Sequence, residues 1–181
     1  ALAAIESGKL GEEIVPVTVL ERKETIVVDR DQQPRQTSME QLARLQPRFK
    51  EDGVVTAGTA SGLNDGAAAV VVTSAEYAQK RGLKPIARLV SWAVAGVDPK
   101  IMGIGPCPAI RQALDKANLR LHDLDLIEIN EAFSAQYLAC QKELGFDPEI
   151  ANVNGGAVAL GHPLGASGAR LTLTLIYELG R

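Results

Sequence analysis

The sequence contains little cysteine and histidine, no excess of basic charge, and no apolar run long enough for a membrane. Its 181 residues include two cysteines and two histidines, and the net charge is −3. Two cysteines are too few for a disulfide scaffold or a cysteine zinc site, and they are typical of a reducing, intracellular compartment. Without a basic patch, nucleic acid is not an expected partner. The longest apolar run, Ala67 to Val72, is far too short to cross a bilayer.

What is present is the composition of a globular protein, with 46% hydrophobic and 23% charged residues. The first residues resemble the last turns of a helix that Gly8 closes. The last residues, Gly180-Arg181, follow directly on another expected helix. We therefore expect the chain to be a piece of something larger.

The expected elements alternate between strands and helices. Two strands, 14–19 and 23–29, precede a short helix that begins at Thr37 or Ser38, where Thr37 and Glu40 fit a capping box. From residue 67 onward we expect strands at 67–73, 85–97 and 124–129, helices at 75–81, 106–117, 131–144 and 166–179, and a glycine-rich loop at 155–165. This order predicts a layered α/β fold with a mixed or parallel sheet.

His162 is the stronger of two candidate proton-transfer residues. It lies in a loop with five glycines, directly before Pro163 and an apolar helix, so the backbone can present the imidazole rigidly. Histidine exchanges protons near neutral pH, which suits catalysis, although a buried structural histidine fits the pattern equally well. His122 lies in a polar connection and is expected to be a solvated loop residue. The loop lacks the lysine of a P-loop and the dinucleotide fingerprint, so nucleotide phosphate is a poor ligand for it.

Asn130 and Ser61 are further candidates. Asn130 follows the expected strand 124–129, where ligands of α/β folds bind, but it could equally be a simple helix cap. Ser61 lies in a loop rich in glycine and threonine and could be an ordinary turn serine. Neither Cys107, between two prolines, nor Cys140, at a core position of a helix, has the electropositive setting that a nucleophilic cysteine needs.

Five collinear motifs resemble those of the thiolase family. They are 130–133 (Asn-Glu-Ala-Phe), 154–168 (Asn-Gly-Gly-Ala to Gly-Ala-Ser-Gly), 56–67, 102–106 and 13–17. The resemblance implies a thiolase-like layered α-β-α fold, truncated at both ends. It divides the chain into residues 1–84, the end of the N-terminal domain with part of the coenzyme A-binding loop region, and residues 85–181, a C-terminal domain that lacks its last strands.

The resemblance also assigns roles to residues. It implies that His162 activates a nucleophilic cysteine and donates to the thioester oxygen, and that Asn130 holds a water in the same oxyanion hole. Ser61 matches the serine that contacts the pantetheine arm of coenzyme A. Phe49, Leu63 and Phe133 match apolar positions along the tunnel that holds this pantetheine arm. Thr37 and Arg35 match the region that contacts the nucleotide end of coenzyme A. Family members often have arginine at position 34, where this chain has proline.

The implied activity is reversible thiolysis of 3-ketoacyl-CoA or Claisen condensation of acetyl-CoA, as in fatty acid metabolism. Coenzyme A thioesters are then substrates, with no tightly bound cofactor and no metal, in a bacterial cytoplasm or a mitochondrial matrix. Both family cysteines fall outside the sequence, so we expect the chain alone to be inactive and its parent to be a homodimer or homotetramer. The alternatives are a non-catalytic coenzyme A-binding or assembly module and a ketoacyl synthase, whose motifs the chain lacks.

Overall fold

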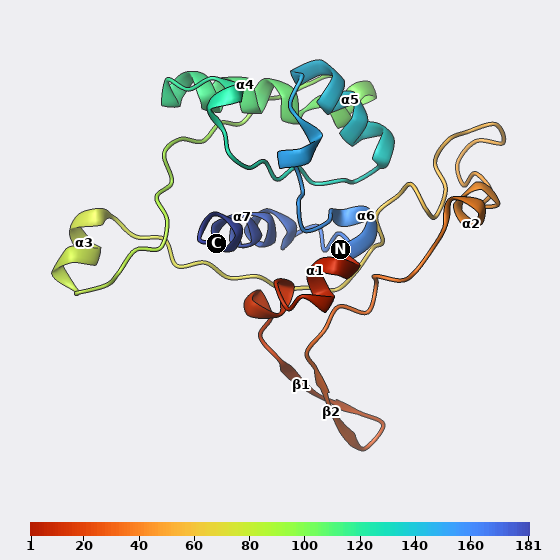
Figure 1. Cartoon of the computed structure of the whole chain (residues 1–181), viewed down its shortest axis with the longest axis horizontal. Helices are drawn as coiled ribbons and strands as arrows, with labels where there is room; N and C mark the ends of the chain where they lie inside the picture. Colours follow the sequence, from red (N-terminus) through yellow and green to blue (C-terminus); the bar gives the residue numbers. More distant parts are fainter.

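The computed structural model describes all 181 residues and places the C-terminal helix α7 at the centre of the molecule (Figure 1). The elements in chain order are α1 (Leu2–Glu6), η1 (Leu10–Glu13), β1 (Val17–Glu21), β2 (Glu24–Val28), α2 (Met39–Ala43), α3 (Ala75–Lys80), η2 (Pro99–Ile104), α4 (Pro106–Ala117), η3 (Leu121–Asp123), α5 (Ser134–Leu144), η4 (Pro148–Ile150), α6 (Ala157–Leu160) and α7 (Ser167–Leu179), where η denotes a 3-10 helix. None of these helices combines the length and the apolarity needed to traverse a bilayer.

The helices begin and end where local chemistry predicts. Pro106 occupies the first turn of α4, and Asn118 closes that helix in the left-handed conformation with φ of +55°. Gly145 ends α5 with φ of +75°. The predicted helices at 75–81, 106–117 and 166–179 are confirmed within about a residue at each end. The short helix α2 is capped by Ser38, whose hydroxyl accepts from the Gln41 backbone N–H, so the capping box predicted at Thr37 is wrong.

The only regular sheet is the hairpin formed by β1 and β2, which projects from the body of the molecule (Figure 1). Its antiparallel register pairs Val17 with Val28 and Val19 with Ile26. The second predicted strand is confirmed. The first lies three residues further along the chain than predicted, because Ile14 closes the 3-10 helix η1 and the pairing begins only after Pro16.

Two predicted strands are not strands in this chain. Residues 67–73 and 85–97 have no backbone partners, and valines expected in the core are exposed, including Val71 at 93%. The second segment is held against α4 by side chains instead: Ser91 Oγ donates to the Ala113 carbonyl at 2.7 Å, and Lys116 Nζ donates to the Trp92 carbonyl at 3.0 Å. Apolar, β-branched sequence favours extended backbone, but a sheet also requires a neighbouring strand, and no strand of this chain pairs with either segment.

The third predicted strand, 124–129, pairs at a single point. Ile127 forms a parallel bridge with Ala151, and these two residues join Ile129 and Phe146 in the hydrophobic core. The ring of Tyr137 on α5 packs edge-on against Phe146 with centroids 5.8 Å apart. The core therefore lies between the 127–129 segment, α5 and the chain around residue 150.

The chain exposes more surface than a compact monomer of its mass. Its solvent-accessible area is 13146 Å², and only 16 of its 181 residues are buried. A compact monomer of 19.2 kDa exposes about 8,400 Å². Exposed apolar side chains of the hairpin and of the two extended segments contribute to this excess.

Charged contacts tie α7 to the N-terminal segment and to the core. Thr174 Oγ1 donates to Glu13 at 2.7 Å, and Arg170 lies 4.0 Å from Glu128, whose side chain is only 5% exposed. Burial raises the pKa of Glu128 to about 7, and this outweighs the opposing effect of the Arg170 guanidinium. Glu13 and Asp31, near the same arginine, also have pKa values raised by burial.

We predict that stability falls as pH rises through the titration of Glu128. The folded state holds this proton up to about pH 7, whereas the unfolded carboxyl releases it near 4.5, so the stabilising contribution is complete below pH 4.5 and lost by pH 7. The loss is on the order of 3 kcal/mol. Urea unfolding across this pH range should show that the free energy of unfolding declines less in Glu128→Gln than in wild type or in the exposed control Glu51→Gln. Equal slopes in all three proteins would contradict the assignment.

Candidate active site

The site is organised by Asn152, whose side chain pairs with the backbone of Ile129. After the Ile127–Ala151 bridge, Asn152 adopts a positive φ of +48° and turns the chain away. Its amide then bonds both backbone groups of Ile129: Oδ1 accepts from the N–H and Nδ2 donates to the carbonyl, each at 2.9 Å. The buried side chain thus continues the ladder in place of a strand, and it fixes the backbone directly before Asn130.

His162 follows the short helix α6 and is held at three points. Gly161 adopts φ of +101°. Because it has no Cβ, it leaves room for the Asn64 side chain, with which a Cβ would overlap. The backbone N–H of His162 donates to the Gly62 carbonyl at 3.0 Å. Its ring lies between Ser167 Oγ, 2.6 Å from Nδ1, and Asn130 Nδ2, 3.3 Å from Nε2.

The hydrogen bonds of Ser167 define which ring nitrogen of His162 carries the proton. The buried Ser167 hydroxyl has one hydrogen, which it donates to the Pro163 carbonyl at 3.1 Å. On this ground we assign the Ser167 oxygen as the acceptor of Nδ1–H of His162. Nε2 is then the unprotonated nitrogen, and it accepts from the Asn130 amide. An unprotonated Nε2 is a base that is ready to receive a proton.

Asn130 is not a helix cap, which corrects one of the two interpretations of the sequence. Helix α5 begins only at Ser134, with Phe133 at its N-cap position. Residues 132–134 pair instead with the 59–61 loop, and the amide of Asn130 faces His162. Its Oδ1 is buried and has no hydrogen-bond partner within the chain. A buried acceptor of this kind is costly unless a water or ligand donates to it.

The loop that contains Ser61 is attached to the same motif. Ala60 forms an antiparallel bridge with Phe133, and both the backbone N–H and the hydroxyl of Ser61 donate to the Ala132 carbonyl at 3.1 Å. Ser61, Asn130, Phe133 and His162 are therefore brought together from three separate parts of the chain. The hydroxyl oxygen of Ser61 keeps its lone pairs available for an N–H of a ligand.

The remaining predicted binding residues lie at the surface. Leu63 follows Gly62 with its side chain 86% exposed, and Phe49 is 80% exposed. Thr37 and Arg35 are exposed as well. The segment before them reaches the site through Gln33, whose Oε1 accepts from Asn64 Nδ2 at 3.4 Å. The structure gives none of these four side chains a contact with His162.

Both cysteines are buried between helices and lack the setting of a nucleophile. Cys107 on α4 and Cys140 on α5 are 1% and 0% exposed, and Cys140 Sγ donates to the Gly103 carbonyl at 3.3 Å. Burial raises the pKa of the Cys107 thiol to about 11. A thiol with such a pKa carries little thiolate at neutral pH. No three His, Cys, Asp or Glu side chains converge as a metal site would require.

Comparison with known proteins identifies the family. The family description "Thiolase, N-terminal domain" matches residues 1–76, and "Thiolase, C-terminal domain" matches residues 83–181. The chain belongs to the thiolase family. An acetyl-CoA acetyltransferase of Paracoccus denitrificans is 54% identical over the whole of this thiolase chain, which covers 46% of that relative.

Solved structures confirm the α/β fold class. The crystal structure of the Bacillus anthracis acetyl-CoA acetyltransferase matches the whole chain with a TM-score of 0.98 and 58% identity, over 46% of its own length. Human mitochondrial 3-ketoacyl-CoA thiolase in complex with CoA matches 99% of the chain with a TM-score of 0.89 and 49% identity, over 45% of its length. The chain thus spans about half the length of the thiolases it matches. The division at residues 84 and 85 stays a prediction.

Sequence reasoning gave no role to Ser167, the residue that orients the thiolase histidine. Ser167 was considered only as one residue of the 154–168 motif. The available signal was its place in the first turn of an apolar helix, five residues after His162, where a serine returns its hydroxyl to the preceding loop.

We predict that His162 carries its neutral-state proton on Nδ1. In ¹⁵N NMR of the imidazoles, His162 should show one protonated and one unprotonated ring nitrogen, with Nδ1 the protonated one, and exposed His122 provides the internal control. Ser167→Ala removes the acceptor and should bring the two ring resonances of His162 together. Protonation on Nε2 in the wild-type protein would refute the hydrogen-bond assignment.

Proposed function

We propose that this chain supplies the base and the oxyanion-stabilising groups of the thiolase reaction, on 3-ketoacyl-CoA or acetyl-CoA. The observation that carries the proposal is the contact between Asn130 Nδ2 and His162 Nε2 at 3.3 Å, beside a buried Oδ1 that has no partner. Two nitrogens of this kind can hold the oxygen of a thioester or of a water between them. The names of the relatives support the substrate class.

In thiolysis, a cysteine thiol from outside this chain gives its proton to Nε2 of His162. The thiolate attacks C3 of the 3-ketoacyl-CoA, and the C2–C3 bond breaks, which leaves an acyl thioester on sulfur and the enolate of acetyl-CoA. Because Nε2 now bears a hydrogen, it can donate to a developing oxyanion, with Asn130 beside it. The enolate takes up a proton, and free coenzyme A then removes the acyl group from sulfur. Claisen condensation is the reverse sequence.

The binding residues follow the same proposal. Ser61 would accept an amide N–H of the pantetheine arm, and Phe49, Leu63 and Phe133 would line its tunnel. Thr37 and Arg35 would lie at the nucleotide end. The exposed apolar positions of Phe49 and Leu63 support contact with an apolar partner or ligand. We also propose a role in fatty acid metabolism, a bacterial cytoplasmic or mitochondrial matrix location, and a dimeric or tetrameric assembly.

Activity would require a complementary polypeptide. Both cysteines of the chain are buried, and residues 67–73 and 85–97 present unpaired extended backbone that a further strand could bond. The buried cysteines also favour the second candidate function, a module that binds coenzyme A or assembles with a partner without catalysis of its own.

We predict that thiolysis appears when the chain is combined with the complementary part of a thiolase that supplies both family cysteines, and that it depends on His162. Acetoacetyl-CoA cleavage should fall at least about 10²-fold in His162→Ala, and about 10²- to 10³-fold in Asn130→Ala, because each removes an oxyanion donor. His122→Ala is the matched control and should keep full activity. A reconstituted complex that is fully active without His162 would exclude this function, and one that binds coenzyme A without activity would favour the module.

We predict that Ser61→Ala raises KM for coenzyme A more than it lowers kcat in that complex. A pantetheine contact is made equally in the ground state and the transition state, so its loss weakens binding uniformly. The variant also loses the hydroxyl bond to Ala132, so thermal melting should accompany the kinetics. Ser74→Ala, which removes an exposed cap of α3, is the control, and an unchanged KM in Ser61→Ala would remove this residue from the binding site.

A further inference from the structure

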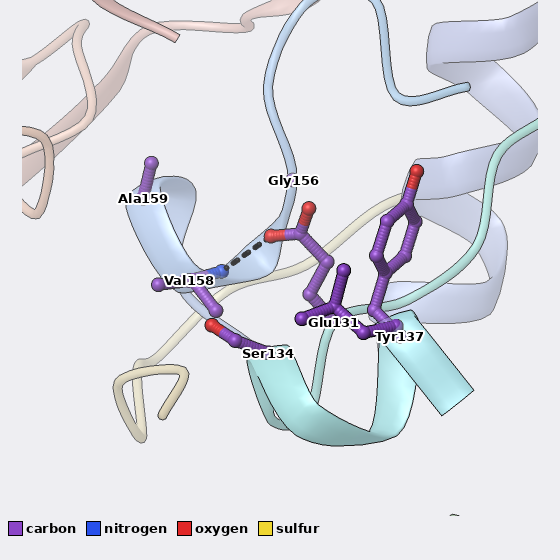
Figure 2. Close-up of a pocket in the computed structure, with 7 residues that line it drawn as sticks. Glu131, Ser134, Tyr137, Gly156, Val158 and Ala159 are labelled. Carbon is purple, nitrogen blue, oxygen red and sulfur yellow. Dashed lines mark hydrogen bonds between the residues drawn. The ribbon is translucent and has the colours of Figure 1, made fainter. Parts of the chain in front are cut away.

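The carboxylate of Glu131 bridges the two segments that carry the proposed catalytic pair. Its Oε2 accepts from the Val158 backbone N–H at 3.1 Å, and its Oε1 accepts from Asn152 Nδ2 at 3.1 Å. Figure 2 shows the Glu131 side chain, which lies three residues before α5, reaching across to the first turn of α6. Glu131 is adjacent to Asn130 in sequence, whereas α6 ends two residues before His162.

The Val158 N–H is one of the first-turn donors that a helix cannot satisfy internally. Helix α6 has only four residues and no side-chain cap of its own, so Glu131 supplies the anchor for its N-terminus. On the other side, Asn152 uses one amide hydrogen for Ile129 and the other for Glu131. One carboxylate therefore connects the ladder before Asn130 to the helix before His162.

Gly156 makes this bridge possible. The Glu131 carboxyl group lies directly over its Cα, where a Cβ would overlap the carbon and both oxygens of that group. The backbone of Gly156 is extended, with φ of −106°, so the glycine is required here for close approach and not for a left-handed turn. Any side chain at this position would push the carboxylate away from Val158.

We propose that Glu131 is a positioning residue that fixes the distance between Asn130 and His162, and that Gly156 is needed to seat it. This inference rests on the proposed function only for its consequence in catalysis. The geometry itself is a property of the chain. A carboxylate that accepts from N–H donors on two segments restrains both segments. If Glu131 only capped α6, the bond from the Val158 N–H would be sufficient, and the bond from Asn152 would serve no purpose.

The test uses the ring nitrogens of His162, which do not depend on activity. Glu131→Gln keeps the shape of the side chain but offers one acceptor oxygen in place of two. Either Asn152 Nδ2 or the Val158 N–H is then left facing the NH₂ group of the new amide. We expect the separation between the two His162 ring ¹⁵N resonances to shrink, with those of His122 unchanged. Gly156→Ala should produce the same shift. The exposed control Glu149→Gln should leave both histidines as in wild type.

A double-mutant cycle separates this role from a general structural one. In a Glu131→Ala background no carboxylate remains for the new methyl group to displace, so Gly156→Ala should add no further shift. An additive effect would overturn the role of Gly156. Unchanged His162 resonances in folded Glu131→Gln would overturn the role of Glu131. If that variant loses cooperative melting, Glu131→Asp, which shortens the reach by one methylene, is expected to show the same shift.

Reconstituted thiolysis adds a second readout. Glu131→Gln should lower kcat by about 10- to 100-fold with KM unchanged, because a misplaced base and donor affect the transition state more than binding. A rise in KM at unchanged kcat would assign Glu131 to binding and contradict the proposal. If the wild-type complex shows no thiolysis, the proposed function fails, and the His162 resonances still decide whether Glu131 positions the ring.

Discussion

The active-site arrangement depends on the pairing of the Asn152 side chain with the backbone of Ile129. This buried amide replaces a backbone neighbour at the point where the parallel pairing of Ile127 and Ala151 would otherwise continue. The substitution satisfies both polar groups of Ile129 and lets the main chain turn away at once. As a result, Asn130 is held rigidly at the end of the ladder, while the chain is free to form α6 and return with His162.

The chemistry of the site and the surface of the chain are consistent with each other. The structure holds a base and an amide in place, yet it encloses its own two thiols between α4 and α5, and burial raises the pKa of the Cys107 thiol. The two extended segments, 67–73 and 85–97, expose apolar side chains and have no backbone partners. The matched relatives in this family are about twice as long, and under the proposed function the half that this chain represents would contribute proton transfer and oxyanion stabilisation.

Local signals predicted the helices well and the strands poorly. The proline at the start of α4, the asparagine and glycine after α4 and α5, and the serine before α3 each determine a boundary through short-range chemistry. The valines of 67–73 carry an equally strong β signal, but strand formation depends on residues distant in sequence. For the same reason, Asn130 could not be distinguished from a helix cap until the 59–61 loop was seen to pair beside it.

The sequence alone determined the family, the α/β class and the identity of the candidate catalytic residues, because five motifs in fixed order carry that information without coordinates. Tertiary structure decided how those residues are arranged. It showed that Ser167 orients the His162 ring, that Glu131 lies over Gly156, and that Asn130 faces an imidazole and not a helix end. These contacts join residues separated by up to 32 positions in the sequence, and no local propensity or spacing specifies which side chains meet across such separations.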